Sequence, residues 1–238
     1  MVGLTAAQLG ALSTAQIARL SAAQIRMIEA TDIPGLTTAQ VEVLAPFQVA
    51  AMTAPQVASL TTLQLSAIDG RDISAMSPMA QISALSSEQI GALLSTQIKA
   101  MSPSHVRAIS SVAIPGFTPG QLDDLSAPQM AALTPEQITA MTSAQIGALT
   151  PAQVGVFSGA QLAAIDWSEI AALTTAAIAG LKARQLEKLP EFLISLTTSQ
   201  FASLREAELA KLPPGLAAEF TAPQIRSMTN SQIGRLTP

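Results

Sequence analysis

Residues 134–157 read TPEQITAMTSAQIGALTPAQVGVF and contain nearly the same eight-residue sequence three times. Numbered from its first apolar residue, one such octad runs from Leu133 to Ala140. Octads of this kind continue from Leu4 to Arg235, 29 in all, and residues 236–238 begin a thirtieth. A sequence that repeats at a fixed short period along its whole length predicts a repeat protein.

Proline indicates where each octad can begin a helix. A single continuous helix does not suit a period of eight, because its apolar stripe would rotate by about 80° per octad. Eight of the 15 prolines occupy position three of an octad and three occupy position four. Proline is tolerated in the first turn of a helix and is costly in its interior. The sequence therefore predicts a new helix in every octad.

Position two and position five of the octad support the same phase. Position two is Ser or Thr in 20 of the 29 octads, and all 20 Gln residues fall at position five. A hydroxyl followed three residues later by Gln is the pattern of a capping box, in which each side chain bonds the other residue's backbone N–H. Acids gather at positions two to five and bases at positions seven and eight, as separate helix dipoles favour.

Such short helices need neighbours, since isolated helices below roughly a dozen residues are marginal in water. Positions one and six supply two apolar side chains per octad, and position eight is mostly Ala or Gly. We therefore predict an all-α superhelical solenoid, or rod, of about 29 octapeptide repeats with one short capped helix per repeat. Residues 1–238 are expected to form a single domain, and the phase slips near 76–84 and 189–195 are candidate kinks.

Five of the nine octads that lack Gln at position five form a weaker second rhythm. They begin at Ile28, Ile68, Ile109, Ile165 and Leu204. Their spacings of five, five, seven and five octads fit a superhelical pitch and fit a history of duplication equally well. In Ile33-Pro34-Gly35 and Ile114-Pro115-Gly116, proline is expected to end a helix early and glycine to adopt a left-handed turn, which makes a corner or bend.

Composition excludes several functional classes. The absence of Cys excludes disulfides, thiolate metal sites and thiol nucleophiles, and a net charge of −4 argues against a nucleic-acid surface. Polar residues interrupt every apolar run, so no membrane span is predicted. The first residues lack the pattern of a secretory signal peptide. The chain therefore stays inside the cell, leaves by a route that needs no such signal, or is part of a longer protein.

Few residues suggest chemistry. His105 occupies position five and is interpreted as a substitute for Gln, because no second His or any Cys is available for a zinc site or an activated nucleophile. Acids spaced three apart suit acid–base chemistry or a hard cation, but helix capping explains them more simply. These pairs are Glu29/Asp32, Asp69/Asp72 and Asp166/Glu169.

Trp167 is expected to pack against a neighbouring turn rather than to form a binding hot spot. The sequence contains neither a Gly-x-Ser-x-Gly elbow nor a glycine-rich phosphate loop. We therefore predict no catalytic, cofactor-binding or metal-binding residue and no cofactor, and an enzyme is the least expected function.

The octad LTxxQIxx resembles a known class of repeat. The stretches LTAAQLGALSTAQIARLSAAQI (Leu4–Ile25) and LTPEQITAMTSAQIGALTPAQV (Leu133–Val154) are similar to octapeptide arrays of very large secreted or surface proteins of Gram-negative bacteria, many of them labelled adhesin-like. This resemblance implies an extracellular or cell-surface location and a role as a spacer or adhesive stalk.

Two functional hypotheses remain. One is a structural or adhesive repeat module that sets distance or forms a filament. The other is a helical solenoid that binds a protein, a peptide or a glycan, including an effector delivered into another cell. Positions three, four, seven and eight are mainly Ala, Ser, Thr and Gly, which favours the structural hypothesis.

The two ends of the array suggest a partner. The first octad, Leu4–Ala11, is as regular as an internal one, and the last residues stop after the cap and the proline of a thirtieth octad. Solenoids normally need polar capping repeats at their ends. We therefore expect the array to continue in a longer parent chain or to stack end to end with other copies.

Overall fold

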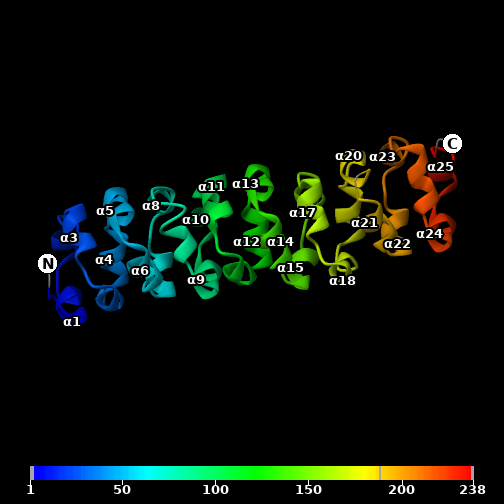
Figure 1. Ribbon diagram of the computed structural model, residues 1–238. Helices are drawn as coiled ribbons and strands as arrows, with labels where there is room; N and C mark the ends of the chain where they lie inside the picture. Colours follow the sequence, from blue (N-terminus) through cyan, green and yellow to red (C-terminus); the bar gives the residue numbers. More distant parts are fainter. Residues whose placement is uncertain (1–2, 188, 237–238) are drawn as a thin grey trace. The chain divides into compact units, whose positions relative to one another are not determined.

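The structure is a computed structural model that describes residues 3–187 and 189–236. Within these residues it contains 25 α-helices, four 3-10 helices and no strand, so the predicted all-α class is confirmed (Figure 1). Each of the 29 octads contributes one of these helices. Thr237 and Pro238, on which the expected thirtieth octad rests, lie outside the described residues. Every described helix is too short to cross a bilayer.

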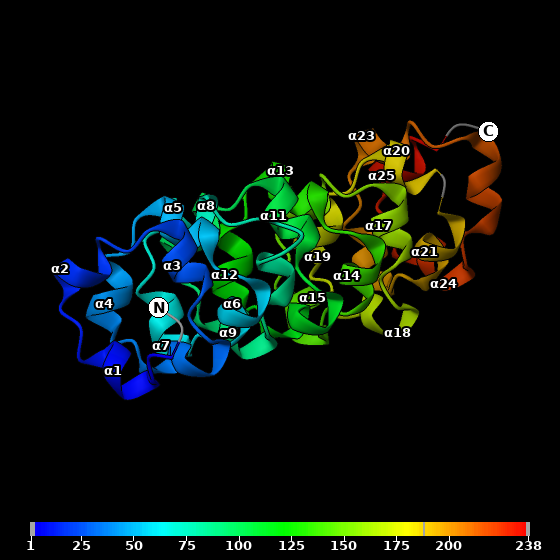
Figure 2. The same cartoon turned by 60° about the vertical axis from the view of Figure 1, so that its left-hand side comes forward.

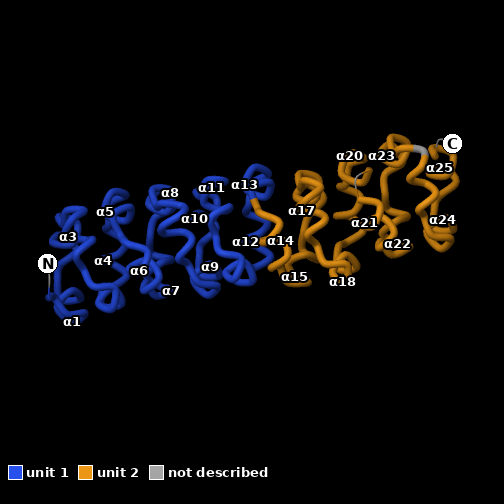
Figure 3. The backbone as a smooth tube through the Cα atoms, in the orientation of Figure 1, with its two compact units in different colours: residues 1–132 blue, residues 133–238 orange. Residues whose placement is uncertain are grey.

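The chain divides into two compact units, residues 1–132 and residues 133–238 (Figure 3). The octad phase passes from the first unit to the second without a slip. The expectation of a single domain therefore remains a prediction, and the two units are described separately below.

The helices of the first unit follow one another at intervals of one octad. They are α1 (Ala6–Gly10), α2 (Thr14–Ile17), α3 (Ala22–Arg26), η1 (Ala30–Gly35), α4 (Thr38–Glu42), α5 (Pro46–Ala51), α6 (Ala54–Ala58), α7 (Thr62–Ser66), α8 (Gly70–Ser74), η2 (Ile82–Ala84), α9 (Ser87–Ala92), α10 (Ser95–Ala100), α11 (Pro103–Ala108), η3 (Ser111–Gly116), α12 (Pro119–Asp124) and α13 (Ala127–Ala132).

The second unit continues the same pattern. Its helices are α14 (Pro135–Thr139), α15 (Ser143–Gly147), α16 (Pro151–Val154), α17 (Gly159–Ala163), α18 (Trp167–Ile170), α19 (Thr175–Ala179), α20 (Ala183–Leu186), α21 (Pro190–Ser195), α22 (Thr198–Ala202), α23 (Glu206–Leu209), η4 (Pro214–Glu219), α24 (Ala222–Ser227) and α25 (Asn230–Ile233).

The predicted capping boxes are confirmed. In α14, the Thr134 hydroxyl accepts a hydrogen bond from the Gln137 N–H at 3.2 Å, and Gln137 Oε1 accepts one from the Thr134 N–H at 2.7 Å. Where position two lacks a hydroxyl, as at Ala45 and Leu94, the Gln side chain still accepts from the backbone N–H of that residue. The Gln at position five therefore caps helices even without its partner.

Stacking in each unit joins helices that are three octads apart. In the first unit α3 packs against α5 and α11 against α13 (Figures 1 and 2), and in the second α16 packs against α19 and α22 against α24. The side chains of positions one and six fill the space between these turns, and Ile98 and Ile138 are completely buried. One turn of the coil thus takes between three and four octads. The five-octad rhythm of the sequence is not the superhelical pitch.

The Gln residues have a second role that the sequence did not reveal. Gln48 is fully buried, and its Nε2 donates to the carbonyls of Ile17 at 2.9 Å and Leu20 at 2.8 Å, 31 and 28 residues earlier. The same pair of bonds recurs at Gln56 and Gln64. Each of these three Gln residues therefore caps its own helix through Oε1 and binds the preceding turn of the coil through Nε2. We call this series of contacts the glutamine ladder.

The two phase slips shift the glutamine ladder without breaking it. The extra residue of 76–84 lies in a turn before η2, and Gln81 donates to carbonyls 32 and 29 residues earlier. After the missing residue of 189–195, Gln200 donates to carbonyls 30 and 27 residues earlier. The ladder thus tolerates a change of one residue in the length of a turn.

Two glycines, Gly35 and Gly116, allow the backbones of successive turns of the coil to come into contact. The Cβ of an alanine at Gly35 would lie 2.3 Å from the carbonyl oxygen of Ala6, and one at Gly116 would lie 2.0 Å from that of Ser87. Neither glycine has a left-handed backbone conformation, because Gly3 is the only described residue with a positive φ. The expected left-handed turns are therefore wrong. Pro34 and Pro115 lie within 3-10 helices, which end at the glycines that make these close contacts.

Candidate functional site

Charged side chains are concentrated where the octad is least regular. The chain has 28 charged residues, 12 basic and 16 acidic, and ten of them fall within residues 182–219. Two of the octads in this segment, beginning at Leu204 and Leu212, have Glu208 and Leu216 at position five in place of Gln. The segment therefore differs from the regular array in both charge and pattern.

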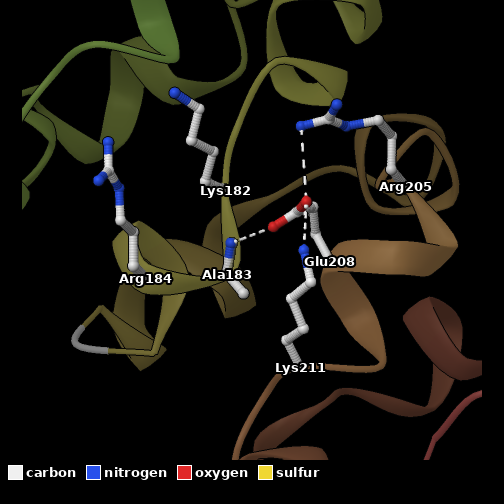
Figure 4. A pocket seen from close by; sticks show the side chains of 6 residues that line it. All are labelled: Lys182, Ala183, Arg184, Arg205, Glu208 and Lys211. Atoms are coloured by element: carbon white, nitrogen blue, oxygen red, sulfur yellow. Dashed lines mark hydrogen bonds and ion pairs between the residues drawn. The ribbon is translucent and has the colours of Figure 1, made fainter.

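A basic pocket lies in this segment, entirely within the second unit (Figure 4). Its volume is about 440 Å³, and it is lined by Lys182, Ala183, Arg184, Arg205, Glu208 and Lys211. The first three residues come from the start of α20, and the other three come from α23 and its flanking residues. Four cations thus surround one carboxylate in a protein whose net charge is −4.

Glu208 holds the two sides of the basic pocket together. Its carboxylate accepts a hydrogen bond from the Ala183 N–H at 2.8 Å and contacts Lys211 at 3.0 Å and Arg205 at 3.9 Å. The bond from the Ala183 N–H, more than the two cations, holds the pKa of Glu208 below its usual range. Glu208 is therefore ionised at neutral pH and is engaged by the protein itself.

The other cations of the pocket are less constrained. Arg205 also donates to the carbonyl of Leu181 at 3.2 Å, a position-one carbonyl of the kind that the glutamine ladder uses elsewhere. The side chains of Lys182 and Arg184 form no hydrogen bond or ion pair with another described residue. In Figure 4 these two side chains lie on one side of Ala183, and Arg205 and Lys211 lie on the other.

His105 takes the place of a glutamine, as predicted. Its Nδ1 lies 3.0 Å from the backbone N–H of Ser102, and its Nε2 lies 2.9 Å from the carbonyl oxygen of Met76. The first contact requires an acceptor and the second a donor, which a neutral imidazole protonated at Nε2 provides. Both ring nitrogens of His105 are therefore engaged in the glutamine ladder.

The acid pairs divide into two roles. At position two, Asp69 and Asp166 cap their own helices as predicted, by accepting from the backbone N–H groups of Arg71 and Ser168. Glu29 makes no such cap, so the capping interpretation is wrong for Glu29.

At position five, the acids reach the preceding turn. Asp32 accepts from the Ala6 N–H at 2.9 Å, and Glu169 accepts from the Ser143 hydroxyl at 3.0 Å. Helix capping within their own octads therefore does not explain these two acids. In the described part of the chain, no three acidic or histidine side chains are grouped closely enough to hold a metal ion.

Asp72 is the exception among the position-five acids. The residue 26 positions earlier is Pro46, which has no N–H to donate, and the carboxyl group of Asp72 makes no hydrogen bond with another described residue. Burial raises the pKa of Asp72 above its ordinary value, Asp69 raises it further, and Arg71 opposes the shift. An ionised Asp72 therefore destabilises the fold.

Replacing Asp72 by Asn should stabilise the protein at neutral pH. A carboxyl group whose pKa is higher in the folded state than in the unfolded state weakens folding as the pH rises above the unfolded value of about 3.9. The gain in melting temperature should therefore be present at pH 7 and disappear below about pH 4. Hydrogen bonds from Ser168 lower the pKa of Asp166, so Asp166→Asn should show no such gain. A gain from Asp72→Asn that is equal at pH 3 and pH 7 would contradict this account.

Trp167 is 54% exposed, at the first position of α18. It lines a small cavity of about 50 Å³ together with Leu189 and Phe192, which belong to a later octad. The expected packing of Trp167 against a neighbouring turn is thus partial.

The basic pocket was not predicted from the sequence. Its one signal there is the concentration of basic residues, since five of the 12 lie within residues 182–211.

Comparison with known proteins identifies the type of repeat. No curated protein matches the chain. A family model described as the ALTTAQ repeat matches residues 25–62, 65–103 and 129–159. The basic pocket lies outside these segments. The chain is therefore a repeat protein, and three of its segments are similar to the ALTTAQ repeat.

Proposed function

We propose that this chain is a structural spacer module of a secreted or surface protein and that it extends by stacking head to tail on a second copy. The observation that carries this proposal is the state of the first turn. Gln8, Gln16 and Gln24 cap their helices through Oε1. Their Nε2 groups donate to no described residue, and all three side chains are exposed.

The opposite end offers complementary groups. The carbonyls of Leu212, Phe220 and Met228 occupy position one, and no described residue donates a hydrogen bond to them. The position-six side chains Ile225 and Ile233 are 37% and 47% exposed, whereas the equivalent residues of internal octads are almost completely buried. One end thus provides amide donors, and the other provides carbonyl acceptors and apolar surface.

A second copy fits these requirements because its first turn carries the donors that the last turn lacks. Contacts between two different surfaces of identical chains continue into a filament unless the geometry closes a ring. Further octads of a longer chain would present the same groups. The resemblance to large surface repeat proteins agrees with this spacer or adhesive role.

The proposal is tested by changing the donors without changing the caps. The triple variant Gln8→Glu, Gln16→Glu and Gln24→Glu keeps an oxygen that accepts the cap N–H. It removes every amide donor from the first turn and places charges where carbonyl oxygens would approach. Light scattering should show a mass that rises with concentration for the wild type and a constant monomer mass for the variant.

The matched control adds three acids elsewhere. Thr38→Glu, Thr62→Glu and Thr198→Glu alter exposed first residues of α4, α7 and α22, where acids suit the helix dipole. This control should assemble like the wild type, with lengths by negative-stain microscopy that grow with concentration. A wild type that stays monomeric at every concentration, or a control that loses assembly equally, would overturn the proposed stacking.

A further inference from the structure

We propose that the basic pocket binds a small molecule that carries a diphosphate group. Lys182 and Arg184 are the primary contacts, since neither side chain has a partner among the described residues. Arg205 and Lys211 provide a second pair of cations on the opposite wall, already shared with Glu208. Arginine forks and lysine ammonium groups are the side chains that bind phosphate oxygens best.

Three residues of the pocket depart from the pattern of the octad. Lys182 and Arg205 stand at position two, where Ser or Thr normally caps the helix, and neither side chain forms a cap. Glu208 replaces the Gln of position five. Each exchange removes a stabilising contact and adds a charge to the same pocket. Residues that break a local rule in this way indicate a functional site.

Glu208 makes the pocket ready for an anion. The Glu208 carboxylate is held beside Ala183, because it accepts a hydrogen bond from the Ala183 N–H. From that position it draws Arg205 and Lys211 into place. Four cations and one carboxylate leave an excess of three positive charges. That excess suits a ligand with two phosphate groups, since a phosphate carries between one and two negative charges at neutral pH.

The lining argues for a polar, compact ligand. Ala183 is the only apolar residue of the lining, and the other five residues carry charged groups that a polar ligand can bind. Its volume of about 440 Å³ falls within the range of about 300–1,000 Å³ typical of small-molecule sites. A diphosphate can bridge the free cations of one wall and the shared cations of the other.

Isothermal titration calorimetry with inorganic pyrophosphate tests the proposal. The full chain should bind one pyrophosphate per protein, and added salt should weaken the binding. The double variant Lys182→Gln with Arg184→Gln removes two cations without removing a hydrogen bond or an ion pair between described residues. Its affinity should fall by about tenfold or more, as expected for the loss of hydrogen bonds to charged groups. Inorganic phosphate and sulfate, at the same ionic strength, should bind more weakly than pyrophosphate.

Two further variants make the result specific. Arg19→Gln with Arg26→Gln removes two exposed cations from the first unit and should leave the affinity unchanged. Glu208→Gln keeps an acceptor for the Ala183 N–H but loses the charge that draws Arg205 and Lys211 into place, so it should weaken binding. No saturable heat with the wild type, equal affinity in the double variant, or equal binding of sulfate and pyrophosphate would overturn the proposal. Because the pocket and the end faces carry different variants, this test and the stacking test fail independently.

Discussion

Replacing Gly116 by Ala should lower the free energy of unfolding by about 2–3 kcal/mol, near the upper end of what overpacking usually costs. The new Cβ would lie 2.0 Å from the carbonyl oxygen and 2.7 Å from the carbonyl carbon of Ser87. Both groups belong to the backbone of α9, so no side chain can rotate to relieve the clash. The contact between η3 and α9 must therefore open, and urea unfolding measures the loss.

Gly120→Ala is the matched control for this change. It lies in the next helix, α12, and nothing lies within 4 Å of its added Cβ. Alanine favours a helix over glycine by roughly 0.5–1 kcal/mol, so Gly120→Ala should raise the stability slightly. Equal effects of the two substitutions would contradict the close backbone contact at Gly116.

Replacing Gln97 by Glu should lower the free energy of unfolding by about 3 kcal/mol or more, because it places a charge against unpaired buried carbonyls. Gln97 is fully buried, and its Nε2 donates to the carbonyls of Leu65 at 2.8 Å and Ile68 at 2.7 Å. Glu has nearly the same shape and retains the oxygen that caps Leu94. The change therefore removes the contact between turns while it leaves the capping oxygen in place.

Gln16→Glu provides the control within the same protein. Gln16 caps Ser13 in the same way, but it is exposed and its Nε2 donates to no described residue. Its replacement should change the stability by less than about 0.5 kcal/mol, as is usual for a surface substitution. Circular dichroism during denaturation compares the two variants. A similar small effect for Gln97→Glu would mean that the ladder contributes little.

Local features of the fold could be predicted from the sequence because each is encoded within one octad. Thr134, Pro135 and Gln137 lie within four residues, so their spacing alone indicates a capped helix. His105 could be interpreted correctly for the same reason, since it occupies the position of Gln. These contacts depend only on the geometry of a single helical turn.

Contacts between turns could not be predicted because the octad does not reveal how many repeats complete a turn of the coil. The contacts of Gln48 with Ile17 and Leu20 can be predicted only once it is known that a turn of the coil takes between three and four octads. The same limit concealed the basic pocket, where Ala183 meets Glu208, 25 residues later in the chain. At Gly116 the sequence suggested a left-handed turn, whereas the glycine is needed for contact with the preceding turn of the coil.

Hydrogen exchange of the glutamine side-chain amides, followed by NMR, tests most directly whether buried glutamines join successive turns. The Nε2 protons of buried residues such as Gln48 and Gln97 should exchange slowly, because each Nε2 group donates to two backbone carbonyls. In the monomeric protein, those of Gln8, Gln16 and Gln24 should exchange as fast as in an unfolded peptide. Equally fast exchange at all these positions would contradict the glutamine ladder.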